Sequence, residues 1–337
     1  MPRSRVTIRD VAAYAGVSHQ TVSRVINRIE RVSPETRAKV EAAIEELGYS
    51  LNAVARSMAR GRTCMVACIS PNLTDFTFAS IIEAAETEAR NHDYFLVSSS
   101  APDEDSFSEL TNQLIRSRRV EGLMVINPYA DDRHKLLVDN FPTVFVGSRP
   151  REEAVSSVAL DDISVSREAT EYLIELGHRQ IAMVTGPTTE DCSQDRTAGF
   201  KQALRNASIQ FDPTLVFTGD WSATTGHKTL KKMAEGNLLP SAIFAQNDRM
   251  AIGILRAARE LNIDVPQELT VIGIDDMPLS SYFDPPLTTM QQDMVTIGRE
   301  AARLLISAVE NPDQSHQELL IPAKLIVRDS TTRFNHN

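Results

Sequence analysis

The sequence of 337 residues is long enough for two or three domains, each with its own core. Its 42% hydrophobic and 24% charged residues are typical of a chain that folds in water, and the lack of an 18-residue apolar run or an apolar leader argues against membrane insertion and export. Three cysteines (Cys64, Cys68 and Cys192) fit no metal-binding spacing, so we expect reduced thiols in the cytoplasm, no metal and no cofactor.

Charge is unevenly distributed along the chain. Residues 1–62 contain 11 Lys and Arg against 6 Asp and Glu, whereas the remainder contains 24 basic and 39 acidic residues. A basic head on an acidic body predicts that only the head contacts a polyanion such as nucleic acid.

Residues 7–27, TIRDVAAYAGVSHQTVSRVIN, have the pattern of two short helices joined by a turn. Thr7 and Ser18 are suited to cap the helices, and Gly16 is suited to the turn between them. The apolar residues recur at helical spacing and predict one buried face per helix: Ile8, Val11, Ala12, Ala15, Val22, Val25 and Ile26. The second helix then presents a polar side made of His19, Gln20, Ser23, Arg24 and Asn27.

This polar side fits the major groove of DNA, where Gln pairs with adenine and Arg with guanine. We therefore predict a helix-turn-helix. A third helix is expected to start at Ser33 and Pro34, to bury Val40, Ile44 and Leu47, and to end at Gly48. A small helical bundle whose polar side is only solvated is the alternative.

From residue 65 onward, short apolar strands alternate with helical patterns. The strand segments read MVACIS, YFLVSSS, GLMVIN, TVFVG, QIAMVTG, LVFTGD, SAIFAQ and LTVIGID. Continuous Val, Ile and Leu runs between helices predict parallel sheets that are covered on both faces. We expect an α/β core of two doubly wound lobes, between which the chain crosses near residues 161–163, 291–293 and 322–324.

Ligands of such folds bind outside the carboxyl ends of the strands, here between the two lobes. The polar and aromatic residues that follow strands are therefore candidates for a site: Asp75, Phe78, Arg149, Asp161, Arg196, Trp221, Asn247 and Asp275. Arg can fork onto neighbouring hydroxyls, Asp accepts from them, and an aromatic face covers C–H groups, so this set suits a polyhydroxylated ring.

Some of these polar residues also have structural explanations. Asp248 and Asp276 could cap the helices that follow them, and Arg196 could form only a salt bridge between the lobes. For His178 we expect a role in shaping the turn into a strand, with no ligand.

The runs DVAAYAGVSHQTVSRVIN and VSPETRAKVEAAIEELGYSLNAVARSMA resemble the headpiece of the lactose/galactose repressor family (LacI/GalR). Blocks such as GDWSA, AQNDRMAIG and PPLTTMQQD extend the resemblance to about residue 330. The resemblance implies that His19, Gln20 and Arg24 read base edges. It implies contacts to phosphates or sugars for Thr7, Ser18, Thr21, Ser23 and Asn27. It also implies a hinge that contacts the minor groove through Asn52, Ala55 and Met58, with Met58 as an apolar wedge.

The same resemblance implies a division of the chain into parts. These are a headpiece (1–50), a hinge (51–62), an N-terminal lobe (63–161 with 293–322), a C-terminal lobe (162–292 with 323–330) and a tail (331–337). The lobes would form a periplasmic-binding-protein-like core that holds a small-molecule effector. The implied effector contacts are Asp75, Phe78, Ser148, Arg149, Asp161, Arg196, Trp221, Asn247 and Asp275.

The block GDWSA is like that of the repressor after which the family is named, which favours a sugar as effector. FVGSR lacks the acidic residue found there, so the sugar need not be a galactoside. A purine or a phosphorylated sugar, controlling a regulator of the same fold, is the alternative.

The sequence as a whole predicts a cytoplasmic repressor that binds near-palindromic double-stranded DNA as a homodimer, because one headpiece makes too few contacts. The last residues contain no leucine heptads, so we expect a dimer and not a tetramer. A sugar-transport protein is a distant alternative, which would leave residues 1–62 without a purpose. The motifs G-x-x-x-x-G-K-[ST], G-x-S-x-G and H-E-x-x-H are absent, which disfavours an enzyme.

Overall fold

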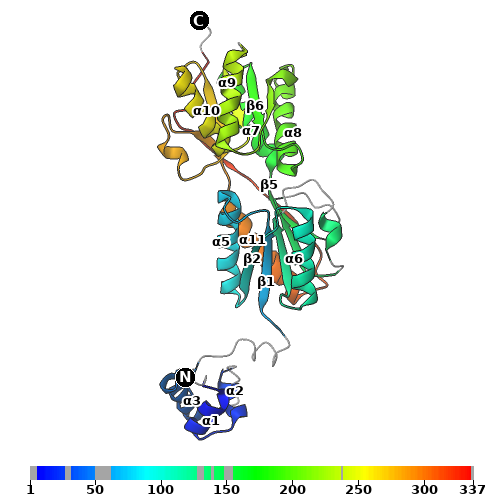
Figure 1. Ribbon diagram of the computed structural model, residues 1–337, viewed down its shortest axis with the longest axis vertical. Helices are drawn as coiled ribbons and strands as arrows, with labels where there is room; N and C mark the ends of the chain where they lie inside the picture. Colours follow the sequence, from blue (N-terminus) through cyan, green and yellow to red (C-terminus); the bar gives the residue numbers. More distant parts are fainter. Residues whose placement is uncertain are drawn as a thin grey trace. The chain divides into compact units, whose positions relative to one another are not determined.

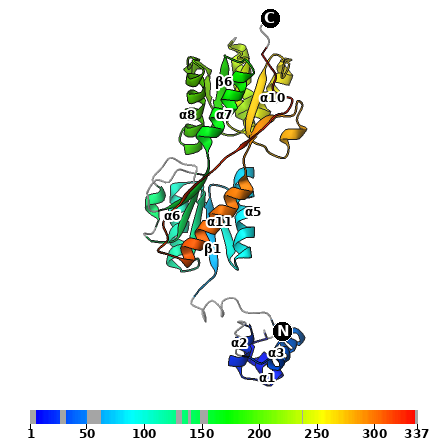
Figure 2. The same ribbon diagram turned by 180° about the vertical axis from the view of Figure 1, so that it is seen from behind.

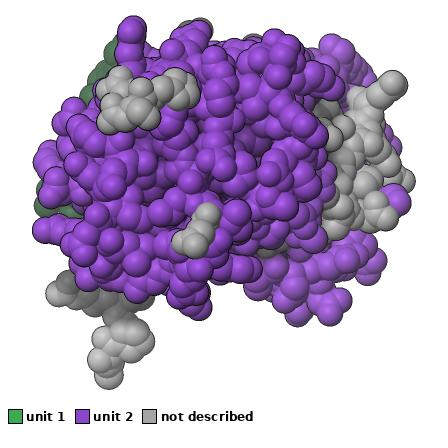
Figure 3. All heavy atoms as spheres, turned by 90° about the horizontal axis from the view of Figure 1, so that it is seen from above, with its two compact units in different colours: residues 1–63 green, residues 64–337 purple. Residues whose placement is uncertain are grey.

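The computed structural model describes residues 6–26, 32–49, 62–126, 133–137, 140–147, 155–236 and 238–334. The chain divides into two units, residues 1–63 and residues 64–337, which have different colours in Figure 3. In this described part of the chain we find no helix with the length and apolarity that crossing a bilayer requires.

The described residues of the first unit form three helices around a small apolar core. They are α1 (Ile8–Ala15), α2 (His19–Ile26) and α3 (Pro34–Glu46). Thr7 and Asp10 form a capping box at the start of α1, and Gly16 ends that helix in the left-handed conformation with φ of 66°. The predicted apolar faces meet in the core, where the fully or nearly buried residues are Val11, Ala12, Val22, Val25, Val40 and Ala43. The helix-turn-helix predicted from the apolar spacing is therefore present.

The second unit consists of two lobes, and the first lobe is built on a wholly parallel sheet. Its strands are β1 (Met65–Ser70), β2 (Phe95–Ser100), β3 (Gly122–Ile126), β4 (Thr143–Val146), β5 (Ser156–Leu160) and β11 (Glu318–Ile321), in the order β11-β5-β4-β3-β1-β2. The helices of this lobe are α5 (Phe76–Asn91), α6 (Glu104–Arg116) and α11 (Met294–Glu310), with a 3-10 turn at Arg133–Leu136.

Alternate residues of β1 point to opposite faces of this sheet and enter different apolar clusters. Val66 and Cys68 pack on the side of α5 and α11, whereas Ala67 and Ile69 pack with Phe107 of α6 on the other side. Figure 1 shows α5 and α6 flanking the sheet, and Figure 2 shows α11 beside α5. The continuous apolar runs in the sequence therefore have the predicted cause, because both faces of the sheet are covered.

The second lobe repeats this plan. Its strands are β6 (Ile181–Thr185), β7 (Val216–Thr218), β8 (Ala242–Ala245), β9 (Thr270–Asp275), β10 (Thr288–Gln291) and β12 (Lys324–Ile326), in the order β12-β10-β9-β8-β6-β7. All neighbours are parallel except β12, which runs antiparallel to β10 at the edge. One face carries α7 (Asp162–Glu175) and α8 (Asp191–Asn206), and the other carries α9 (Ala223–Glu235) and α10 (Asp248–Leu261). Short 3-10 turns lie at Pro213–Leu215 and Ser280–Tyr282.

The chain passes between the lobes at three places, which lie next to one another in Figure 1. It leaves the first lobe after β5, returns between β10 and α11, and leaves again between β11 and β12. A helical headpiece and a two-lobe α/β core confirm the predicted fold class, with one antiparallel edge strand as the departure from a purely parallel arrangement.

Candidate functional site

The first candidate surface is the outer side of α2. Val22 and Val25 are 0% and 4% exposed, which turns His19, Gln20 and Arg24 outward, where all three are exposed.

Four further residues predicted to contact DNA are placed around this helix. Thr7 and Ser18 are exposed, and Thr21 and Ser23 are half-buried. The Ser18 hydroxyl accepts from the Thr21 amide at 3.1 Å, so Ser18 caps α2 as predicted. The other predicted contacts lie outside the described residues: Asn27, Asn52, Ala55 and Met58.

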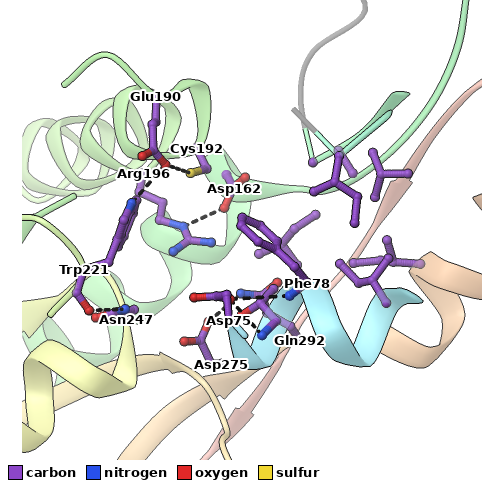
Figure 4. Close-up of a pocket in the computed structure, with 18 of the residues that line it drawn as sticks. Asp75, Phe78, Asp162, Glu190, Cys192, Arg196, Trp221, Asn247, Asp275 and Gln292 are labelled. Carbon is purple, nitrogen blue, oxygen red and sulfur yellow. Dashed lines mark hydrogen bonds and ion pairs between the residues drawn. The ribbon is translucent and has the colours of Figure 1, made fainter. Parts of the chain in front are cut away.

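The second candidate site is a cavity between the two lobes, at the carboxyl ends of strands from both sheets. The cavity brings together six of the predicted effector contacts, which are drawn in Figure 4: Asp75, Phe78, Arg196, Trp221, Asn247 and Asp275. Ser148 and Arg149, also predicted, lie outside the described residues.

The two walls of this cavity differ in chemistry. The first lobe supplies a mainly apolar wall made of Phe78, Ile81, Ile126, Val146, Ala159, Leu160 and Ile297. The second lobe supplies a mainly polar wall made of Asp162, Glu190, Cys192, Arg196, Trp221, Asn247, Arg249 and Asp275.

Arg196 is the central cation of the polar wall. Its Nε donates to Asp162 Oδ1 at 2.6 Å and its Nη1 donates to the Gln246 carbonyl. Burial by itself would lower the pKa of Arg196, but Asp162, together with Cys192 and Asp275, outweighs that effect and raises the pKa above its ordinary value. Asp162 and Arg196 both belong to the second lobe, so the alternative of a salt bridge between lobes does not describe this pair.

Trp221 lies across the cavity between Glu190 and Asn247, as Figure 4 shows. Its indole N–H donates to Glu190 Oε2 at 2.9 Å, and its carbonyl accepts from Asn247 Nδ2 at 3.1 Å. The guanidinium of Arg196 is 5.7 Å from the ring centroid, within the range of a cation–π contact. The ring passes directly over Gly186, where any Cβ would overlap it. Trp221 itself has φ of 66°, an unusual backbone conformation for a bulky residue.

Asp275 occupies the end of β9 with φ of 128°, also uncommon for a residue other than glycine. Its Oδ1 accepts from Gln292 Nε2 at 2.6 Å, at the point where the chain returns to the first lobe. Burial, followed by the nearby Asp248 carboxyl, raises the pKa of Asp275 well above its ordinary range. Burial and a second carboxyl group therefore both act against further negative charge at this position.

Asp248 is buried behind Asp275 and is not the cap of α10. It accepts from the hydroxyls of Ser280 and Thr289, both at 2.6 Å, and burial raises its pKa to about 6. Asn247 caps α10 instead, through its Oδ1 and the Met250 amide. Asp276, the other proposed cap, forms an ion pair with Arg328 at 2.6 Å.

Asp75 has two roles at the edge of the cavity. Its Oδ1 accepts from the Thr77 and Phe78 amides at the start of α5, and its Oδ2 accepts from Arg249 Nη2 at 2.5 Å. Because Arg249 is on α10, this ion pair links the two lobes.

Asp161, also predicted as an effector contact, is not among the described residues that line this cavity. It caps α7 by accepting from the Ser164 amide at 3.1 Å, and its neighbour Asp162 lines the cavity. Asp161 borders an adjacent hollow together with Asp191, Asp195 and Glu318. His178 is 2% exposed and contacts Ser241 and the Thr332 carbonyl, which agrees with a structural role.

Sequence reasoning missed several lining residues, among them Glu190, Cys192, Arg249 and Gln292. Glu190 and Cys192 lie in the loop after β6 and the first turn of α8, so the rule that polar residues follow strands could have found them. Burial raises the pKa of Glu190 to about 7 and that of the Cys192 thiol above its ordinary value. Among the described residues, no group of His, Cys, Asp and Glu is arranged to hold a metal ion.

Two family models match this chain. The family model "Bacterial regulatory proteins, lacI family" matches residues 7–52, and the model "Periplasmic binding protein-like domain" matches residues 170–331. The HTH-type transcriptional repressor CytR of Escherichia coli (strain K12) is 31% identical over 331 residues, which cover 96% of each chain.

Two solved structures are similar over nearly the whole chain. The lac repressor dimer bound to operator and the anti-inducer ONPF is 32% identical, with a TM-score of 0.90 and coverage of 98% of this chain and 100% of that one. A complex of the transcriptional regulator CelR with cellobiose is 32% identical, with a TM-score of 0.75 and coverage of 97% and 100%. This chain belongs to the lacI family of bacterial regulatory proteins.

Proposed function

We propose that this protein is a homodimeric transcriptional repressor that binds a near-palindromic operator through α2, and that a sugar in the cavity between the lobes controls its operator affinity. One observation carries the proposal. The same chain combines an exposed set of side chains suited to reading bases with a cavity that has one apolar and one polar wall. We infer that the chain binds and regulates and does not catalyse a reaction.

The DNA-binding half of the proposal rests on α2. His19, Gln20 and Arg24 are exposed on one side of a helix whose other side is fixed in the core by Val22 and Val25. A helix held in this way can enter the major groove as a rigid element. The net positive charge of residues 1–62 favours approach to phosphates. Since operator DNA is in the bacterial cytoplasm, we place the protein there.

The sugar half of the proposal rests on the two walls of the cavity. A pyranose ring has an apolar C–H face and a rim of hydroxyls, which match the wall around Phe78 and Ile81 and the wall around Arg196 and Asp275 respectively. Binding of cellobiose by the similar CelR supports this class of ligand.

Dimer formation follows from the need for two headpieces on one operator, and the similar lac repressor is a dimer on its operator. Candidates for the dimer contacts are residues 81–89, residues 250–261 and the region of Tyr282. Ile81, Ala85 and Ala89 are buried in the first lobe, so only the outer face of α5 is available for such contacts. Tyr282 is 85% exposed and is free to enter an interface.

A sugar can act on DNA affinity by favouring one degree of lobe closure. An equilibrium is moved from 99:1 to 1:99 by about 5.5 kcal/mol of differential binding, which two sites in a dimer can supply together. The three chain crossings between the lobes are the segments that would transmit this change, since any closure must bend them.

The test is a selection of double-stranded oligonucleotides from a random pool by the full-length protein, followed by competition with a panel of sugars and nucleosides. We expect one enriched near-palindromic motif and at least one sugar that changes its affinity at least tenfold. A pool that stays random would refute the DNA-binding half. An enriched motif that responds only to nucleosides would refute the sugar and support the purine-type alternative.

A further inference from the structure

The charges that line the cavity are unbalanced. Among the described lining residues there are four carboxyl groups (Asp75, Asp162, Glu190 and Asp275) and two guanidinium groups. Each guanidinium already has a carboxylate partner: Arg196 is 2.6 Å from Asp162, and Arg249 is 2.5 Å from Asp75. The described part of the lining thus has no cation left to balance a further negative charge.

The two remaining carboxyl groups, Glu190 and Asp275, are held by neutral donors. Trp221 Nε1 donates to Glu190 at 2.9 Å, and Gln292 Nε2 donates to Asp275 at 2.6 Å. Figure 4 shows that Glu190 and Asp275 come from opposite sides of the second lobe's wall, with Trp221 and Arg196 between them. A ligand that contacts both Trp221 and Arg196 therefore lies between two carboxyl groups.

Glu190 also occupies the position where an anion would otherwise be favoured. It immediately precedes α8, and the amino end of a helix attracts negative charge. Its side chain makes no capping hydrogen bond and reaches the indole N–H across the cavity instead. The Glu190 carboxyl group thus already lies at the amino end of α8, on the side that faces the cavity.

Hydroxyl groups suit this environment in a way that phosphate does not. A hydroxyl both donates and accepts, so it matches a carboxyl group whether that group is protonated or ionised. Burial raises the pKa of Glu190 to about 7, so both forms are populated near neutral pH. A phosphate ester would bring up to two negative charges between Glu190 and Asp275, with both arginines already paired.

We propose that the effector is an uncharged carbohydrate, and that Glu190, assisted by Asp275, is the residue that excludes phosphorylated sugars from the cavity. The inference rests on the proposed function and refines it by naming the class of sugar. In this inference, phosphorylated sugars are excluded by electrostatic repulsion and not by the size of the cavity.

The test compares matched pairs of sugars on the full-length protein by isothermal titration calorimetry. The pairs are glucose with glucose 6-phosphate, ribose with ribose 5-phosphate, and cellobiose with cellobiose 6′-phosphate. For the pair that binds, we expect the phosphorylated member to bind at least tenfold more weakly. Glu190→Gln should reduce that ratio at least threefold, and Asp275→Asn should reduce it independently. Glu175→Gln removes an exposed charge from the same lobe, outside the cavity, and should leave the ratio unchanged.

The outcomes separate this inference from the proposed function. Equal or tighter binding of a phosphorylated member would overturn the inference and leave a sugar-responsive repressor in place. A preference for the neutral member that neither variant reduces would overturn the role of Glu190 and Asp275. Failure of both members of every pair to bind, together with no response to any sugar of the panel, would overturn the proposed sugar response itself, and the inference with it.

Discussion

Asp75 and Arg249 join the two lobes through an ion pair of 2.5 Å between Asp75 Oδ2 and Arg249 Nη2. The other carboxylate oxygen of Asp75 caps α5, so one side chain both starts a helix of the first lobe and contacts α10 of the second. The Asp75 side chain is 12% exposed and that of Arg249 is 39% exposed. Because the Arg249 side chain is partly exposed to solvent, a modest contribution of about 0.5–1 kcal/mol is expected from the pair.

Removing this ion pair should weaken sugar binding, because the lobes lose a contact that holds the cavity in its present form. We expect Arg249→Gln to reduce the affinity for the sugar found by screening about 2- to 5-fold, which corresponds to about 0.5–1 kcal/mol. Asp75→Asn keeps a residue able to cap α5 and should have the same effect. Calorimetry on the double variant should show no further loss, whereas additive losses would mean that the two side chains act separately. Arg256→Gln, which breaks an ion pair within α10, is the control.

Gly186 and Trp221 form a second critical contact. A Cβ at position 186 would overlap the indole ring, so Gly186→Ala should displace Trp221 and weaken sugar binding at least tenfold. Trp221 is the only tryptophan of the chain, and its intrinsic fluorescence therefore reports on this site alone. We expect the variant to shift the emission spectrum and to lose the change that sugar causes. In the control variant Gly236→Ala, the added Cβ would lie 3.4 Å from its nearest neighbouring atom, which is an ordinary contact. This variant should therefore preserve the wild-type signal.

The sequence was sufficient to predict the framework of the cavity. Strands with unbroken apolar runs are buried on both faces, and their carboxyl ends converge by topology. For that reason Trp221, Asn247 and Asp275, each placed at or just after the end of a strand, were identified as candidates from position alone. The apolar spacing in residues 7–27 likewise predicted which side of α2 is exposed.

Contacts that depend on the exact phase of a helix or on two lobes meeting could not be predicted. Asp161 and Asp162 are adjacent carboxylates, and only the start of α7 decides that the first caps the helix and the second faces Arg196. The Asp75–Arg249 pair spans 174 positions of the sequence and exists because of how the lobes close. The raised pKa of Glu190 is a consequence of burial by tertiary structure, which local sequence does not show.

The pKa of Glu190 makes stability depend on pH in a definite direction. In the unfolded chain the carboxyl titrates near its ordinary value of 4.5, whereas in the native protein its pKa is about 7. Between these values the native state binds a proton that the unfolded state has lost, so stability falls as pH rises from about 4.5 to 7. Gln does not titrate, and Glu190→Gln should therefore gain stability relative to wild type between pH 5 and pH 8.

The gain is expected to be about 1 kcal/mol or more, or about 2–4 °C in melting temperature. It is measured as the difference in melting temperature between variant and wild type across that range, without sugar. Glu175→Gln provides the baseline, because Glu175 is exposed. A difference that stays constant with pH would show that Glu190 is already ionised in the native protein at pH 5.

Arg24 tests whether the exposed side of α2 reads sequence. Its side chain is exposed in the last turn of the helix, where it can form a bidentate pair with guanine in the major groove. Arg24→Ala should weaken binding to the selected motif by about 1–3 kcal/mol per half-site and relax the preference at one base pair. Lys39→Ala removes an exposed charge from α3, and any loss of affinity it causes should be equal for all DNA sequences. Fluorescence anisotropy with the selected motif and its single-base variants distinguishes a loss of base preference from a uniform loss of affinity. An unaltered base preference in Arg24→Ala would show that Arg24 does not take part in sequence recognition.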